Sequence, residues 1–79
     1  MMNINQSTTR MATNIPALER IVMHAFSLAP ALRRAFLLCD IQGFTTAEAA
    51  GILGISALAV TIRLERARRE MNVRLAVAS

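Results

Sequence analysis

Apolar and polar positions follow helical spacing from about residue 16 onward. The first run places five apolar residues on one face of a helix: Leu18, Ile21, Val22, Ala25 and Phe26. Pro16 suits the first turn of that helix, while Pro30 cannot continue it but can open the next one. The pattern therefore predicts a first helix from Pro16 to about Leu28.

The second run predicts a helix over about residues 31–41, with a buried face formed by Leu32, Ala35, Phe36 and Cys39. Gly43 follows, and a left-handed glycine commonly ends a helix. At Thr45 the pattern T-T-A-E begins, in which the threonine hydroxyl and the Glu48 carboxylate can each accept a hydrogen bond from the other residue's backbone N–H. A third helix is predicted from this cap to about Leu53.

Residues 54–56, Gly-Ile-Ser, form the predicted turn between the third and fourth helices. Glycine permits a sharp turn, isoleucine is expected to face the core, and serine can cap the next helix. We expect Ala50 and Val60 at the crossing of the two helices, because a close crossing needs small or inward-facing side chains. The fourth helix is predicted over about residues 57–75.

Four helices without a strand pattern predict an all-α domain that contains a helix-turn-helix, of the winged-helix-type DNA-binding superfamily but without a wing. The domain is predicted over residues 15–79. Residues 1–14 are polar and lack apolar periodicity, and we expect them to form a flexible arm.

Charge narrows the choice of partner. All 9 basic residues are arginine, against 5 acidic residues, which gives a net charge of +4. Because the guanidinium fork suits phosphate, a polyanionic partner is expected. The lone Cys39 cannot form an internal disulfide and is predicted to be a small buried apolar residue, as expected in a reducing cytoplasm. No export signal and no apolar run of membrane-spanning length is present, so no membrane partner is expected.

A longer set of residues keeps one register through the last three predicted helices: Pro30, Arg34, Leu38, Asp40, Gly43, Glu48, Ala50, Leu53, Gly54, Ile55, Ser56, Val60, Arg63, Leu64, Arg66, Ala67 and Arg68. In this pattern the chain resembles region 4 of bacterial sigma factors, most closely the extracytoplasmic-function group. The resemblance covers about residues 16–76. LuxR-type regulators share the helix-turn-helix but lack the final Arg-x-Arg-Ala-Arg.

The resemblance implies a bacterial cytoplasmic domain whose fourth helix enters the major groove of the promoter −35 element. It also implies docking on the β flap of RNA polymerase. Region 2, which binds the core enzyme and melts the −10 element, has no counterpart in this sequence. We therefore expect either a stand-alone region 4 that works with a separate region-2 protein, or a piece of a longer sigma factor.

The fourth helix divides into two opposite stripes. One holds Val60, Leu64, Ala67 and Met71 and is predicted to face the core, whereas the other holds Leu58, Ile62, Glu65, Arg69 and Val73. The predicted DNA-binding residues are Thr45, Ser56, Leu58, Thr61, Ile62, Arg63, Glu65, Arg66, Arg68 and Arg69. Arginines flanking the outer stripe suit phosphate contact, and Arg66 can read guanine.

Two other uses of this helix stay open. The exposed apolar residues Leu58, Ile62 and Val73 suit a protein interface, with an anti-sigma protein, RNA polymerase or a second copy as the partner. Alternatively, Glu65 with Arg69 and Glu70 with Arg74 are spaced to form ion pairs on a merely solvated helix.

Catalytic and metal chemistry are not expected. His24 stands alone, Met23 and Met71 are predicted to fill the core, and Asp40 and Glu48 have helix-end roles. The sequence has no glycine-rich phosphate loop, no nucleophile triad and no metal-ligand cluster, so it predicts neither an enzyme nor a cofactor.

Overall fold

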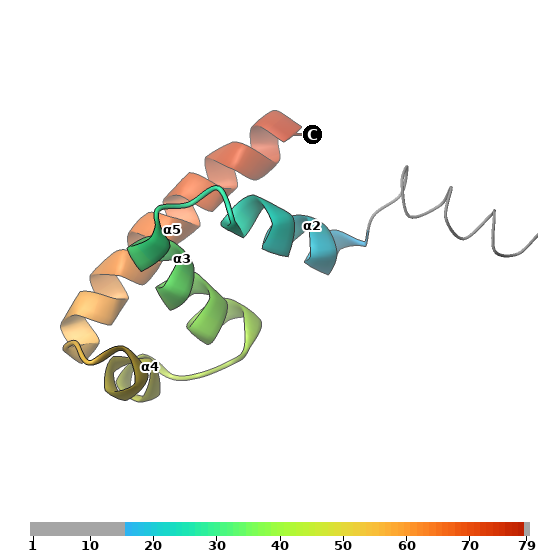
Figure 1. Cartoon of the computed structure of the whole chain (residues 1–79). Coiled ribbons are helices and arrows are strands. Elements are labelled where there is room, and N and C mark those ends of the chain that lie inside the picture. Colours follow the sequence, from blue (N-terminus) through green and yellow to red (C-terminus); the bar gives the residue numbers. More distant parts are fainter. Residues whose placement is uncertain (1–15, 79) are drawn as a thin grey trace, which may run out of the picture.

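The computed structural model describes residues 16–78 and contains only helices over that range (Figure 1). The elements are α2 (Ala17–Ala25), α3 (Pro30–Phe36), the π-helical segment η1 (Leu37–Ile41), α4 (Thr46–Leu53) and α5 (Ala57–Ala78). The predicted all-α fold with four helices is confirmed. The predicted N-terminal arm, residues 1–14, lies outside the described residues.

Helix α2 is shorter and less buried than predicted. It ends at Ala25, where Phe26 and Leu28 donate backbone hydrogen bonds to the carbonyls of Met23 (3.3 Å) and Ala25 (3.0 Å). The predicted buried residues Leu18 and Phe26 are 60% and 62% exposed, and Met23 is also exposed rather than filling the core. The reason is that α2 packs on α5 and η1 mainly through Ala25 and Ile21, while its first turn extends beyond the core.

Pro30 opens α3 as predicted, and the helix continues without a break into η1. There the backbone widens, so that the N–H of Gln42 bonds to the carbonyl of Leu37 at 3.0 Å, five residues back. Gly43 follows with φ of 85°, and Phe44 donates to the Leu38 carbonyl at 3.0 Å. The predicted second helix therefore exists, but its last turn is a π-helix.

Both predicted helix caps are present. Thr45 N donates to Glu48 Oε1 at 2.9 Å, and Glu48 N donates to Thr45 Oγ1 at 3.1 Å. Gly54 takes the left-handed conformation with φ of 70°, and Ser56 Oγ accepts from Ala59 N at 3.0 Å. The chain bends by 105° between α4 and α5, within the range of a helix-turn-helix.

The core forms where α5 crosses the other helices. The residues buried there are Ala25, Leu28, Leu32, Ala35, Phe36, Ala49, Val60, Leu64, Ala67 and Met71. The predicted core stripe of α5 is thus confirmed in full. At the helix crossing Ala49, rather than the predicted Ala50, is fully buried, because one residue along a helix turns the side chain by about 100°. Ile55 is half-buried.

Cys39 is half-buried and packs against the core from η1. Burial raises the pKa of its thiol, and the neighbouring Asp40 carboxylate raises it further. Cys39 therefore stays a neutral, weakly polar packing group, close to its predicted role.

The capping box gives a stability prediction. Replacing Thr45 with alanine removes the acceptor for Glu48 N, so the free energy of unfolding should fall by about 1 kcal/mol in urea denaturation. The matched variant Thr45→Ser keeps the hydroxyl and should retain most of the stability. Equal losses in the two variants would contradict the role of the hydroxyl.

Candidate nucleic-acid interface

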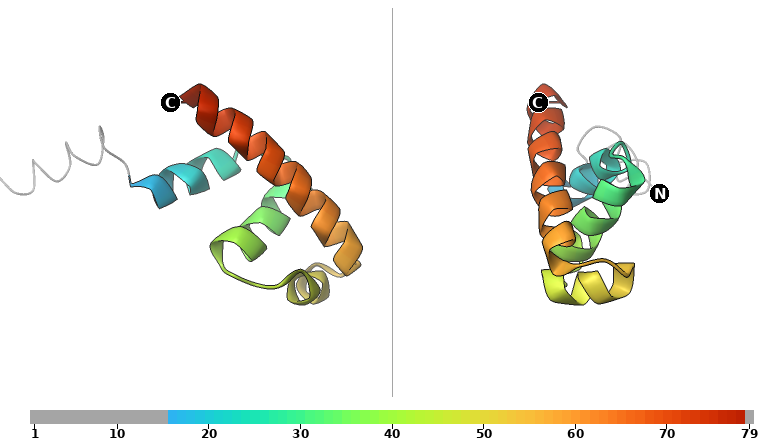
Figure 2. Two further views of the ribbon diagram at one scale, coloured as in Figure 1. Left: turned by 180° about the vertical axis from the view of Figure 1, so that it is seen from behind. Right: turned by 90° about the vertical axis from the view of Figure 1, so that its left-hand side faces the viewer.

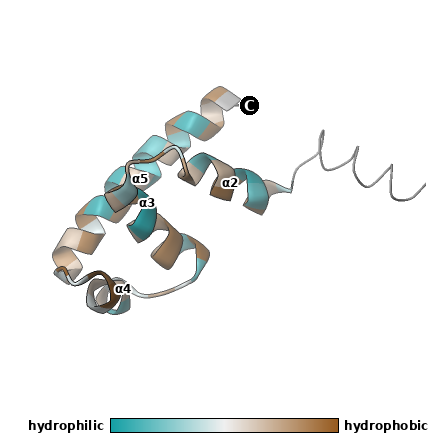
Figure 3. Ribbon diagram, viewed as in Figure 1, coloured by the Kyte–Doolittle hydropathy of each residue, from teal (hydrophilic) through white to brown (hydrophobic). Residues whose placement is uncertain are grey.

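Helix α5 runs along one side of the molecule, with α2, α3 and α4 on its other side (Figure 2). Its outer face is therefore open to a partner. The three apolar residues of the predicted outer stripe are exposed: Leu58 by 69%, Ile62 by 58% and Val73 by 64%. Figure 3 shows that the start of α5 is mainly hydrophobic and its middle hydrophilic.

Arg68 forms an ion pair with Asp40 at the surface of the fold, which the sequence pattern does not indicate. Its Nε and one terminal nitrogen donate to the two carboxylate oxygens of Asp40 at 2.8 and 2.6 Å. The hydrogen bonds to Asp40 raise the pKa of the guanidinium, which stays charged. Since the partners lie 28 residues apart, no local spacing signals the pair. It ties η1 to the middle of α5.

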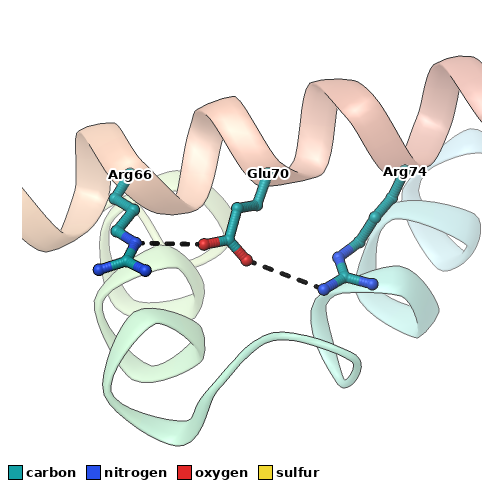
Figure 4. Close-up of polar contacts among 3 residues, drawn as sticks. All are labelled: Arg66, Glu70 and Arg74. Atoms are coloured by element: carbon teal, nitrogen blue, oxygen red, sulfur yellow. Dashed lines mark hydrogen bonds and ion pairs between the residues drawn. The ribbon is translucent and has the colours of Figure 1, made fainter.

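Glu70 lies between two arginines on one flank of α5 (Figure 4). Its carboxylate is 3.3 Å from Nε of Arg66 and 3.8 Å from a terminal nitrogen of Arg74. The predicted pairing of Glu70 with Arg74 is confirmed. Arg66 therefore reaches the surface with part of its charge already compensated, although its side chain is 66% exposed.

Arg63 and Arg69 form no side-chain hydrogen bond or ion pair within the described part of the chain. The predicted pair between Glu65 and Arg69 is absent, although both side chains are exposed and four residues apart. Arg63 is half-buried at the flank and Arg69 lies on the outer face. Within residues 16–78, these two arginines are the ones on α5 whose donors have no partner in the fold.

The three predicted hydroxyl groups have local partners. Thr61 Oγ1 donates to the Ala57 carbonyl at 3.0 Å, while the Thr45 and Ser56 hydroxyls accept from helix amides. The first backbone N–H groups of a helix have no intrahelical partner and favour an anion. The start of α5, capped by Ser56, thus adds a weak attraction for phosphate.

Within residues 16–78, no group of three potential metal ligands occurs. No single helix in that range is long and apolar enough to cross a membrane, and α4 with α5 meets the length and composition criteria only as a pair bent by 105°.

The fold and the outer face define a helix-turn-helix domain with an arginine-rich second helix. A family model described as sigma-70, region 4 matches residues 27–71, which is more than half of the chain. The chain therefore belongs to the sigma-70 region 4 family. The match runs from the turn before α3 to Met71 in α5. No curated protein and no solved structure gives a significant match.

Membership of this family assigns the chain to transcription. Sigma-70 region 4 is a DNA-binding domain associated with RNA polymerase, and the family is regulatory rather than enzymatic.

The ion pair between Asp40 and Arg68 should contribute measurably to stability. Because both side chains are partly exposed, water screens the pair, and Asp40→Asn should lower the free energy of unfolding by about 1 kcal/mol. A double-mutant cycle with Arg68→Gln isolates the interaction. If the two substitutions prove additive, the carboxylate and the guanidinium are not coupled in solution.

Proposed function

We propose that α5 binds duplex DNA of the promoter −35 type and that the domain also contacts the β flap of RNA polymerase. The observation that carries the proposal is the pair of unpartnered arginines, Arg63 and Arg69, on the open helix of a region 4 domain. The free donors of Arg63 support a contact to phosphate, and those of Arg69, on the outer face of the helix, support a contact to a base edge.

Phosphate contacts are assigned to the flanks of α5. Arg63 and Arg66 lie on the same flank and suit the phosphates of one DNA strand. Thr45 and Ser56 cap the first turns of α4 and α5, the helix ends that would approach the DNA backbone. Arg68 uses two donor groups on Asp40, and the remaining N–H groups of its half-exposed guanidinium can still meet a phosphate oxygen. Its net electrostatic contribution is smaller because Asp40 compensates its charge.

Base contacts are assigned to the outer face. Leu58 and Ile62 suit the methyl groups of thymine, and Glu65 can accept from a cytosine amine. The guanidinium groups of Arg66 and Arg69 can each donate two hydrogen bonds to guanine. The Thr61 hydroxyl donates to the Ala57 carbonyl, and its oxygen can still accept a hydrogen bond from a base. The apolar start of α5 thus favours thymine-containing sequence at that end of the site.

We further propose that the domain, spanning residues 15–79, is of the extracytoplasmic-function type and acts in the bacterial cytoplasm. As the sequence holds no region 2, promoter opening would come from a separate region-2 partner or from another part of a longer sigma factor.

A second candidate function is protein binding through the outer stripe, with an anti-sigma protein, RNA polymerase or a second copy as the partner. The exposure of Leu58, Ile62 and Val73 favours it, because large apolar side chains at helical spacing on an open face are typical of helix docking. In this candidate the arginines steer association instead of reading DNA.

DNA binding is tested by fluorescence anisotropy with a −35-type duplex and a scrambled duplex over a range of salt concentrations. Arg63→Gln should weaken binding to both duplexes and reduce the slope of log K against log salt by about 0.9, the value for one phosphate contact. Arg69→Gln should weaken binding mainly to the −35-type duplex and so reduce the preference for that sequence. Arg20→Gln, on α2, is the matched control and should leave the slope unchanged. Absence of salt-dependent binding would refute the proposal.

The protein-binding candidate is tested with the double variant Leu58→Glu, Ile62→Glu. Two charges on the stripe should weaken docking of an apolar partner surface at least tenfold, measured by titration of a labelled anti-sigma domain or the β flap. Both side chains are exposed, so the variant should remain folded by circular dichroism. Unchanged affinity would remove the stripe from the interface.

A further inference from the structure

The outer face of α5 has the spacing of a coiled-coil seam. Six residues follow one another at alternating intervals of four and three: Leu58, Ile62, Glu65, Arg69, Asn72 and Ala76. All six side chains are exposed. A coiled-coil seam has apolar residues at these intervals. Here Leu58, Ile62 and Ala76 are apolar at the two ends of the face, and Glu65, Arg69 and Asn72 are polar in its middle. The core stripe on the opposite face leaves this seam without a partner in the described structure.

Charge on the seam selects the partner helix. Glu65 and Arg69 are exposed, of opposite sign and without an ion pair in residues 16–78. A partner seam must therefore present one cation opposite Glu65 and one anion opposite Arg69. A second copy of α5 presents both, provided that it runs in the opposite direction. In a parallel pair, Glu65 would face Glu65 of the second copy and Arg69 would face Arg69, and these like charges would repel each other.

The rest of the seam fits the same antiparallel register. With Glu65 opposite Arg69 of the second copy, Leu58 faces Ala76 and Ile62 faces Asn72 of that copy. A large residue thus meets a smaller one at each end, the arrangement that lets facing side chains interdigitate. Val73 lies beside this seam and adds exposed apolar surface at both ends of the pair.

We propose that the outer face of α5 is a self-complementary interface through which two copies of the chain form an antiparallel dimer. Helices α2, α3 and α4 lie on the far side of α5 and leave this approach open (Figure 2). The contact is isologous, so the pair between Glu65 and Arg69 occurs twice. One seam of this length makes a small interface, so weak self-association is expected.

The dimer also regulates DNA binding, a consequence that rests on the function proposed above. The seam contains Leu58, Ile62, Glu65 and Arg69, which are four of the six residues assigned to base contacts. A helix whose outer face is covered by a second helix cannot enter the major groove. Self-association and DNA binding are therefore mutually exclusive.

Sedimentation equilibrium over about 5 µM to 1 mM protein tests the interface, with folding of each variant checked by circular dichroism. Glu65→Arg and Arg69→Glu place like charges opposite one another and should each weaken self-association at least tenfold. An equimolar mixture of the two variants restores opposite charges at both contacts and should form a mixed dimer with near wild-type affinity. The control is Arg34→Glu, which makes a charge change of the same size at an exposed position on α3. This variant should dimerise normally.

Three results would overturn the interface: a wild-type chain that stays monomeric to 1 mM, a mixture that fails to associate, or a dimer that survives Leu58→Glu with Ile62→Glu. DNA binding measured on the same samples separates the two proposals. A monomeric chain that binds DNA refutes the interface alone. A dimer in a chain that never binds DNA supports the interface and refutes the proposed function, together with the regulation that rests on it.

Discussion

The structure depends on the burial of one face of α5. Leu64, Ala67 and Met71 pack against α2 and α3, and Val60 packs where α4 crosses the start of the helix. Without this contact the short helices have too little apolar surface to stay folded. The same contact fixes the rotation of α5 about its axis. It therefore decides which residues point outward, and the exposed face is a direct consequence of the core.

Local patterns were sufficient to predict most of this arrangement. The core stripe follows from helical periodicity, and the caps at Thr45 and Ser56 follow from hydroxyl groups placed three residues before the backbone amides that they accept. These features involve residues within one or two turns, so their geometry is nearly independent of the rest of the chain. The left-handed conformations of Gly43 and Gly54 are local features of the same kind, since each ends a helix.

The features that local patterns did not predict depend on tertiary geometry. Spacing gives no indication that Asp40 meets Arg68, because the contact requires η1 to lie beside the middle of α5. The exposure of Phe26 follows from the early end of α2, where the Arg33 guanidinium lies 5.5 Å from the centre of the ring. Glu65 and Arg69 have the right spacing for a pair but do not form one, since such exposed pairs gain little energy.

These ion pairs change how the arginine-rich helix acts on a partner. Five arginines and two glutamates lie between residues 63 and 74, and Asp40 compensates one further charge from outside the helix. The remaining positive charge is concentrated at Arg63 and Arg69, while the apolar residues are grouped at the start of α5 and beside Arg69. An outer face of this kind attracts DNA less strongly than its arginine count implies, and it offers a helix more apolar contact than a solvated surface would. Within residues 16–78 the outer face is the most exposed part of α5, so two partners that each need Leu58, Ile62, Glu65 and Arg69 compete for it.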